Sequence, residues 1–66
     1  MEIFVNGKSR QVEESFSALQ LLESMELVGK RLALEINEEI VPKSRHAEYL
    51  IAAGDKVEIV NAIGGG

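Results

Sequence analysis

The sequence predicts an α+β domain of the β-grasp architecture, in which a mixed sheet of four or five strands packs on one α-helix. Three observations predict it. Short segments with alternating apolar and polar residues, typical of half-buried strands, occur in both halves of the chain. A single segment with helical apolar spacing lies between the first two strands and the later ones. A connection through this helix allows a parallel strand pair, whereas a ferredoxin-like split fold would need a second full helix.

A β-hairpin opens the predicted sheet. Ile3 and Val5 alternate with their neighbours, and the following Asn6-Gly7 pair is a strong hairpin turn because both residues tolerate a positive φ. Residues 8–12 are then the return strand, whose polar composition suits the edge of a sheet.

The predicted helix has a clear start signal. The Ser17 side chain can accept a hydrogen bond from the backbone of Gln20, whose own side chain can reach back, as in a capping box. Gly29 is the expected stop, so the helix is predicted near residues 18–27. Its apolar stripe consists of Ala18, Leu21, Leu22 and Met25.

The second half of the chain supplies the remaining strands. They are predicted at residues 32–36, 40–41 and 56–60. A turn at residues 37–39 separates the first two, and Pro42 ends the short one because proline has no N–H for a ladder. One helical turn is expected within residues 44–49.

Length and composition exclude several classes of protein. The 66 residues allow one domain, predicted to span residues 1–62, followed by a flexible glycine tail over residues 63–66. The chain has no cysteine, which excludes disulfides and thiolate metal sites, and its one histidine, His46, is expected on the surface. No metal site is predicted.

Charge and hydropathy bear on partners and location. The formal charge of −4 disfavours nucleic acid and favours a partner with a basic surface. No segment approaches the roughly 20 apolar residues of a membrane helix, and no signal peptide is recognisable. We therefore expect a cytoplasmic protein that binds neither nucleic acid nor membranes.

The glycines at the end of the sequence are its most informative feature. Gly64, Gly65 and Gly66 are costly to order, and such a run is also typical of a frayed end or an appended tag. Alternatively, the α-carboxylate of Gly66 is the reacting group, and Gly64 and Gly65 form a backbone thin enough to thread an active-site channel. An extended chain from Val60 to the end would reach roughly 20 Å.

The chemistry of a terminal carboxylate sharpens this alternative. A carboxylate is ionised at neutral pH and unreactive toward nucleophiles, so it needs activation. The usual biological route is a mixed anhydride with the phosphate of ATP. A sulfur nucleophile can then displace AMP and leave a thiocarboxylate, and the chain has no thiol of its own that would compete.

Three stretches resemble the ThiS family of ubiquitin-like sulfur carrier proteins in thiamine biosynthesis. They are Phe4-Val5-Asn6-Gly7-Lys8, the segment from Ala33 to Pro42 that ends in Ile-Val-Pro, and the segment from Gly54 through Val60 into Gly64-Gly65-Gly66. The resemblance implies that an ATP-dependent adenylating enzyme, related to the ubiquitin-activating enzymes, adenylates Gly66. A sulfur donor such as a cysteine desulfurase would then supply the thiocarboxylate sulfur, and thiazole synthase would receive it. The chain would be a carrier and not an enzyme, with no catalytic residue or cofactor of its own, and ATP would be used by its partner.

Three other functions stay open on the sequence alone. The small subunit of molybdopterin synthase resembles this fold, ends in Gly-Gly and carries sulfur by the same chemistry, although those chains are usually longer. A ubiquitin-like modifier would join Gly66 to a lysine through an isopeptide bond. An adaptor domain would not use its tail.

Strand parity predicts a docking surface. If Ile3 and Val57 face the helix, then Phe4 and Val60 point to the opposite face of the sheet. The first and last strands are neighbours in a β-grasp, so Phe4 and Val60 are expected to form one apolar patch with Ile63 at its edge. An exposed apolar patch beside a functional tail suggests a partner site.

Overall fold

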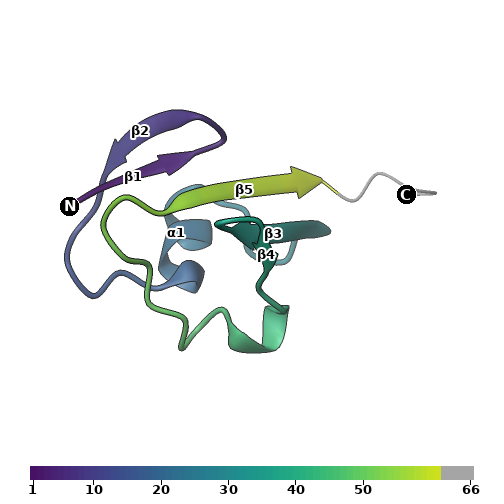
Figure 1. Ribbon diagram of the computed structural model, residues 1–66. Coiled ribbons are helices and arrows are strands. Elements are labelled where there is room, and N and C mark those ends of the chain that lie inside the picture. Colours follow the sequence, from purple (N-terminus) through teal and green to yellow (C-terminus); the bar gives the residue numbers. More distant parts are fainter. Residues whose placement is uncertain (62–66) are drawn as a thin grey trace.

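A five-stranded mixed sheet with one α-helix against it makes up the computed structural model, which describes residues 1–61 (Figure 1). The elements are β1 (Glu2–Val5), β2 (Lys8–Gln11), α1 (Ala18–Ser24), β3 (Leu32–Ile36), β4 (Glu39–Ile40), the 3₁₀ turn η1 (Lys43–Arg45) and β5 (Lys56–Asn61). The predicted α+β fold class and element order are confirmed. The predicted glycine tail at residues 63–66 and the domain boundary before it lie outside the described residues.

The strand order in the sheet is β2-β1-β5-β3-β4, so the last strand of the chain lies in the middle. β5 runs parallel to β1, with Val5 opposite Val57, and antiparallel to β3, with Leu34 opposite Ile59. Both outer pairs, β1–β2 and β3–β4, are antiparallel hairpins. The crossover through α1 places β1 and β5 side by side, as a β-grasp requires.

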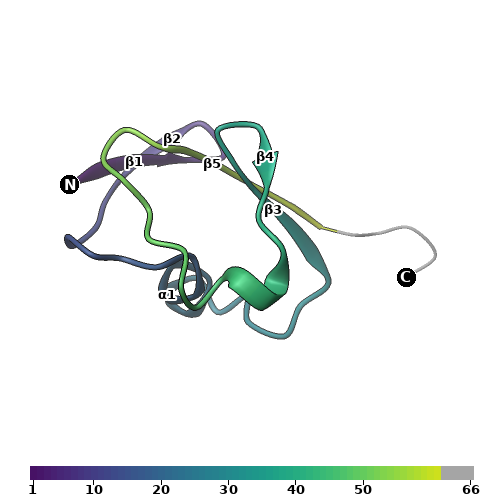
Figure 2. The same ribbon diagram turned by 60° about the horizontal axis from the view of Figure 1, so that its bottom comes forward.

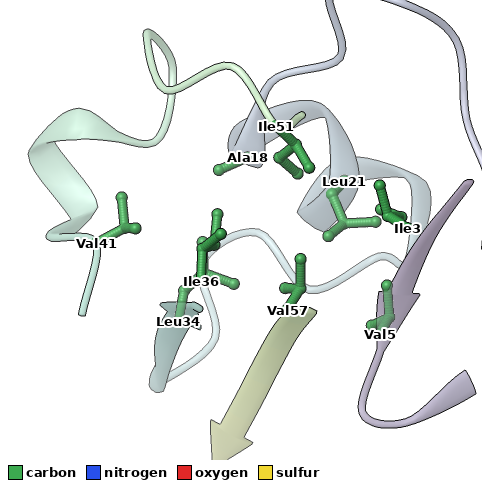
Figure 3. Packing of buried hydrophobic residues seen from close by; sticks show 9 residues of the cluster. All are labelled: Ile3, Val5, Ala18, Leu21, Leu34, Ile36, Val41, Ile51 and Val57. Carbon is green, nitrogen blue, oxygen red and sulfur yellow. The ribbon is translucent and has the colours of Figure 1, made fainter. Parts of the chain in front are cut away.

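The core lies between the sheet and α1 (Figure 3). Side chains from β1, β3 and β5 point toward the helix, and Ala18 and Leu21 face them from α1. The buried cluster comprises Ile3, Val5, Ala18, Leu21, Leu34, Ile36, Val41, Ile51 and Val57. Alternate strand residues therefore point to the other face of the sheet, against which no described helix packs.

The helix is shorter than predicted, because it ends at Ser24. Glu26 has a φ of 58°, and the Leu27 amide donates to the carbonyl oxygen of Leu22 at 2.8 Å. This is a Schellman motif, in which a left-handed residue, usually glycine, ends the helix. The predicted stop, Gly29, does have a φ of 85°, but it lies in the loop beyond the helix end.

The turns after β3 also shift slightly from prediction. Asn37 and Glu38 have φ values of 53° and 70°, the two positive values that a two-residue type I′ hairpin requires. β4 consequently starts at Glu39, one residue earlier than expected. The predicted helical turn is present as η1, likewise one residue earlier.

The segment from η1 to β5 crosses the start of α1 and closes the helix side of the molecule (Figure 2). Ser17 forms an isolated β-bridge with Leu50, and the Ile51 amide donates to the carbonyl oxygen of Phe16 at 2.8 Å. Ile51 thereby joins the core although it belongs to no helix or strand.

Candidate functional site

β5 leads directly into the glycine tail, so the position of β5 fixes where the tail starts. Val57 anchors the strand in the core with only 1% of its surface exposed. At the far end of the strand, Asn61 lies opposite Leu32 of β3. The candidate tail residues Ile63, Gly64, Gly65 and Gly66 lie outside the described residues.

The Asn6 side chain holds β5 from the β1 side. β1 ends at Val5, but the Asn6 amide donates to the carbonyl oxygen of Val57 at 2.8 Å. The Asn6 Oδ1 atom then accepts a hydrogen bond from the Ile59 amide, also at 2.8 Å. A turn residue thus extends the parallel ladder beyond the end of the strand, with its backbone at a φ of 51°.

Asn37 holds the start of β5 from the β3 side. Its amide donates to the carbonyl oxygen of Lys56 at 2.8 Å, and its Oδ1 atom accepts from the Lys56 amide at 3.0 Å. Its Nδ2 atom donates to Asp55 Oδ1 at 2.9 Å, while Asp55 Oδ2 accepts from the Ala52 amide at 2.8 Å. Two asparagines therefore fix β5 on both sides.

These two asparagines were predicted only as turn residues. The local sequence predicts only their positive φ values, because asparagine tolerates the left-handed conformation in turns. Their contacts with β5 depend on sequence separations of 53 and 19 residues, which no local pattern encodes. The sequence feature that comes closest to predicting these contacts is that each asparagine directly follows a predicted strand.

The structure places Phe4 and Val60 on the same face of the sheet, but it separates them. Phe4 lies opposite Lys56, and Val60 is four residues further along β5. This spacing amounts to about 13 Å along the strand, with the Glu58 side chain pointing to the same face between them. The expected single patch is therefore wrong. Phe4 is half-buried, Val60 is 51% exposed, and the two form separate apolar spots.

The charges on this face are mostly negative. Strand alternation places Glu2, Glu35 and Glu58 on it together with Lys56. Glu35 lies directly opposite Glu58 on the neighbouring strand. A face that combines apolar spots with three carboxylates and one ammonium group, among the strand residues described, suits a partner with a basic and partly apolar surface.

His46 is buried, which corrects the expectation that it lies on the surface. Only 6% of its surface is exposed. Its Nε2 atom lies 2.9 Å from the carbonyl oxygen of Val41, and because a carbonyl can only accept, Nε2 must carry the proton. Its own carbonyl oxygen accepts from the Leu19 amide at 2.9 Å. His46 thus joins the segment after β4 to the start of α1.

The described residues offer neither a metal centre nor a transmembrane helix. Within residues 1–61, no three or more histidine and acidic side chains are grouped so that they could hold a metal ion. No helix in the same range is long and apolar enough to cross a membrane. Among the residues described, the side-chain hydrogen bonds of Asn6 and Asn37 both end on β5, the strand that precedes the predicted tail.

Comparison with known proteins identifies the family. Residues 3–66 match the model of the ThiS family. The chain belongs to the ThiS family. Sulfur carrier protein ThiS from Escherichia coli is 30% identical over 66 residues, which is the full length of both chains. Sulfur carrier protein ThiS from Bacillus subtilis is 36% identical over 63 residues, 94% of this chain and 96% of that protein.

Sulfur carriage in thiamine biosynthesis is the function of this family, as the sequence resemblance implied. The crystal structure of the thiamine biosynthesis protein ThiS from Geobacter metallireducens superposes on the whole chain with a TM-score of 0.87 and 29% identity, and the match covers all of that structure. The β-grasp, ubiquitin-like architecture is thereby confirmed.

One relative is a much larger protein. A thiazole synthase from Paramagnetospirillum magneticum is 41% identical over all 66 residues, but the matched part is 20% of that protein. The chain therefore spans about a fifth of the length of this relative.

Proposed function

We propose that the α-carboxylate of Gly66 carries the sulfur. One carboxylate oxygen attacks the α-phosphorus of ATP in an adenylating enzyme, which forms the acyl adenylate and releases pyrophosphate. The terminal sulfur of a persulfide on a donor such as a cysteine desulfurase then attacks the acyl carbon, the bond to AMP breaks, and AMP leaves. A thiol reduces the S–S bond of the resulting acyl disulfide and is itself oxidised to a disulfide with the donor, so that Gly66 ends in a thiocarboxylate whose sulfur thiazole synthase receives.

The observation that carries this proposal is the family match, which continues through Gly66. The geometry supports it, because β5, the strand that precedes the tail in the sequence, is fixed in the folded body by the bond from the Ile59 amide to Asn6. The carrier itself contributes no catalytic side chain in this scheme, and its partners supply ATP and sulfur. We also propose that it acts in the cytoplasm.

Intact-mass spectrometry tests the tail chemistry. We expect the chain, incubated with its adenylating enzyme, ATP and a sulfur donor, to gain the mass difference between one sulfur and one oxygen atom. Deletion of Gly65 and Gly66 should abolish this gain. The same deletion should leave the urea unfolding midpoint unchanged, because the deleted residues follow the end of β5 at Asn61.

Two outcomes would contradict the proposal. A truncated chain that still acquires sulfur would show that another atom carries it. A product joined to a lysine side chain, with a correspondingly larger mass, would instead identify a ubiquitin-like modifier.

We further propose that the adenylating enzyme docks on the sheet face that contains Phe4 and Val60 and also contacts Ile63 of the tail. Phe4→Ala should weaken binding of the carrier to that enzyme by about tenfold, the typical effect of losing one aromatic anchor. Leu50→Ala is the matched control, since Leu50 is 59% exposed but lies beside the start of α1. Equal affinities of both variants, measured by calorimetric titration, would rule this face out.

A further inference from the structure

A groove opens on the helix side of the sheet, away from the face that contains Phe4 and Val60. It has a volume of about 310 Å³ and is bounded by α1, the loop between α1 and β3, the β3–β4 hairpin and η1. Figure 2 shows η1 and this loop on the same side of the sheet. Buried Leu22, Leu34 and Val41 are among its lining residues, so its floor is apolar.

The rim of the groove is also apolar. Val28, in the loop after α1, lines it with 52% of its surface exposed. Val28 is one of the four large apolar side chains exposed within residues 1–61. Ile40 also lines the groove, but its pairing with Glu35 directs its side chain toward the sheet face that contains Phe4. A small ligand that filled only the groove would leave Val28 in water, whereas a protein segment laid along it would cover rim and floor together. The groove therefore fits a protein segment.

The charge of the groove is opposite to that of the whole chain. Lys30 and Lys43 line it, and no aspartate or glutamate does among the residues described. The chain as a whole has 11 acidic and 7 basic residues. His46 lines the groove too, but its Nε2 proton is already donated to Val41. Charge complementarity therefore favours an acidic occupant.

The groove lies next to the point where the tail begins. Leu32 is one of its lining residues, and Leu32 is paired with Asn61, the last residue of β5. Neighbouring strands are about 4.8 Å apart, and the five residues after Asn61 can reach about 17 Å when extended. A protein held in the groove would thus have its active site within reach of the tail.

We propose that this groove docks an acidic segment of thiazole synthase that carries apolar anchor side chains. The inference rests on the proposed function. It assigns the groove to thiazole synthase because the opposite, acidic sheet face suits a different, basic partner. The thiazole synthase from Paramagnetospirillum magneticum, in which a segment similar to this whole chain makes up a fifth of the protein, supports a direct contact between the two.

Binding of the full chain to thiazole synthase, measured without ATP or a sulfur donor, tests the inference. Lys43→Glu should weaken binding by about tenfold, mainly through a slower on-rate, because it places like charges together. Lys8→Glu, a charge reversal on the exposed edge strand β2, is its matched control and should bind as the unmodified chain does. Val28→Ser should also weaken binding, whereas Leu50→Ser, at a similarly exposed position, should not.

The assignment to one partner is tested in parallel. Both groove variants should support ATP–pyrophosphate exchange by the adenylating enzyme at the unmodified rate. The inference is overturned if the unmodified chain does not bind thiazole synthase, if the controls lose as much affinity as the groove variants, or if both partners are affected equally. Since the binding assay needs no thiocarboxylate, a failure of the Gly66 chemistry would leave its result unchanged and the two failures can be told apart.

Discussion

At Asn6, the backbone conformation and the side-chain hydrogen bond can be separated, because each depends on a different property of asparagine. Its φ of 51° lies in the left-handed region, which asparagine tolerates well. Its Oδ1 atom independently binds the Ile59 amide. The hairpin turn and the alignment of β5 are thus joined in one residue.

A graded pair of substitutions at Asn6 measures both contributions. Asn6→Gly keeps the left-handed backbone but removes the acceptor, which should lower the free energy of unfolding by about 1 kcal/mol. Asn6→Ala adds the cost of a left-handed residue with a Cβ, for a total of about 2 kcal/mol. Urea denaturation followed by far-ultraviolet circular dichroism reports both values. If Asn6→Gly is as stable as the unmodified chain, the bond to Ile59 contributes nothing.

At the scale of the element, the start of α1 depends on a segment far from it in sequence. The Ala18 and Leu19 amides donate to the carbonyl oxygens of Tyr49 and His46, both at 2.9 Å. These are amides that a helix start leaves without partners inside the helix. A helix of seven residues is too short to be stable alone, so contacts at its ends matter more than its intrinsic propensity.

The capping box completes this start, and its loss should be measurable. The Gln20 amide donates to Ser17 Oγ at 3.0 Å, and the Ser17 amide donates to Gln20 Oε1 at 2.8 Å. Ser17→Ala should lower the free energy of unfolding by about 1 kcal/mol. Ser44→Ala, at an exposed position in η1, should change it by less than about 0.5 kcal/mol. Equal urea midpoints for the two variants would contradict a stabilising role for the cap.

Local signals in the sequence predicted those elements that local chemistry determines. The Asn6-Gly7 turn and both bonds of the Ser17 capping box occur as expected, because their partners lie within a few residues. The helix end was wrong because Glu26 adopts a conformation usually left to glycine.

Features that depend on distant segments were the ones missed. The buried His46 accepts a hydrogen bond from the Leu19 amide, far away in the sequence, and no pattern around His46 predicts this contact. The separation of Phe4 from Val60 follows from the register of β1 against β5, which strand parity alone does not give. Strand alternation correctly predicted that Phe4 and Val60 share one face of the sheet, but it does not predict the distance between them.

At the scale of the whole molecule, one core supports two surfaces of different character. β1, β3, β5 and α1 all contribute to the buried cluster. The sheet face on one side has mostly carboxylates, while the groove on the other side is lined by lysines. The tail begins from the strand between them, so both proposed partners can reach it while touching different parts of the body.

The central position of β5 has a consequence for synthesis on the ribosome. A nascent chain released before Lys56 lacks the strand that joins the β1–β2 hairpin to the β3–β4 hairpin, so it has two unjoined sheet halves with exposed edges. The sheet can close only after β5 has been translated, and the pairing of β5 with β3 is complete only at Asn61. Prematurely terminated products should therefore be unfolded and be degraded by proteases. The folded molecules are then enriched in chains that were translated at least as far as the end of β5, where the tail begins.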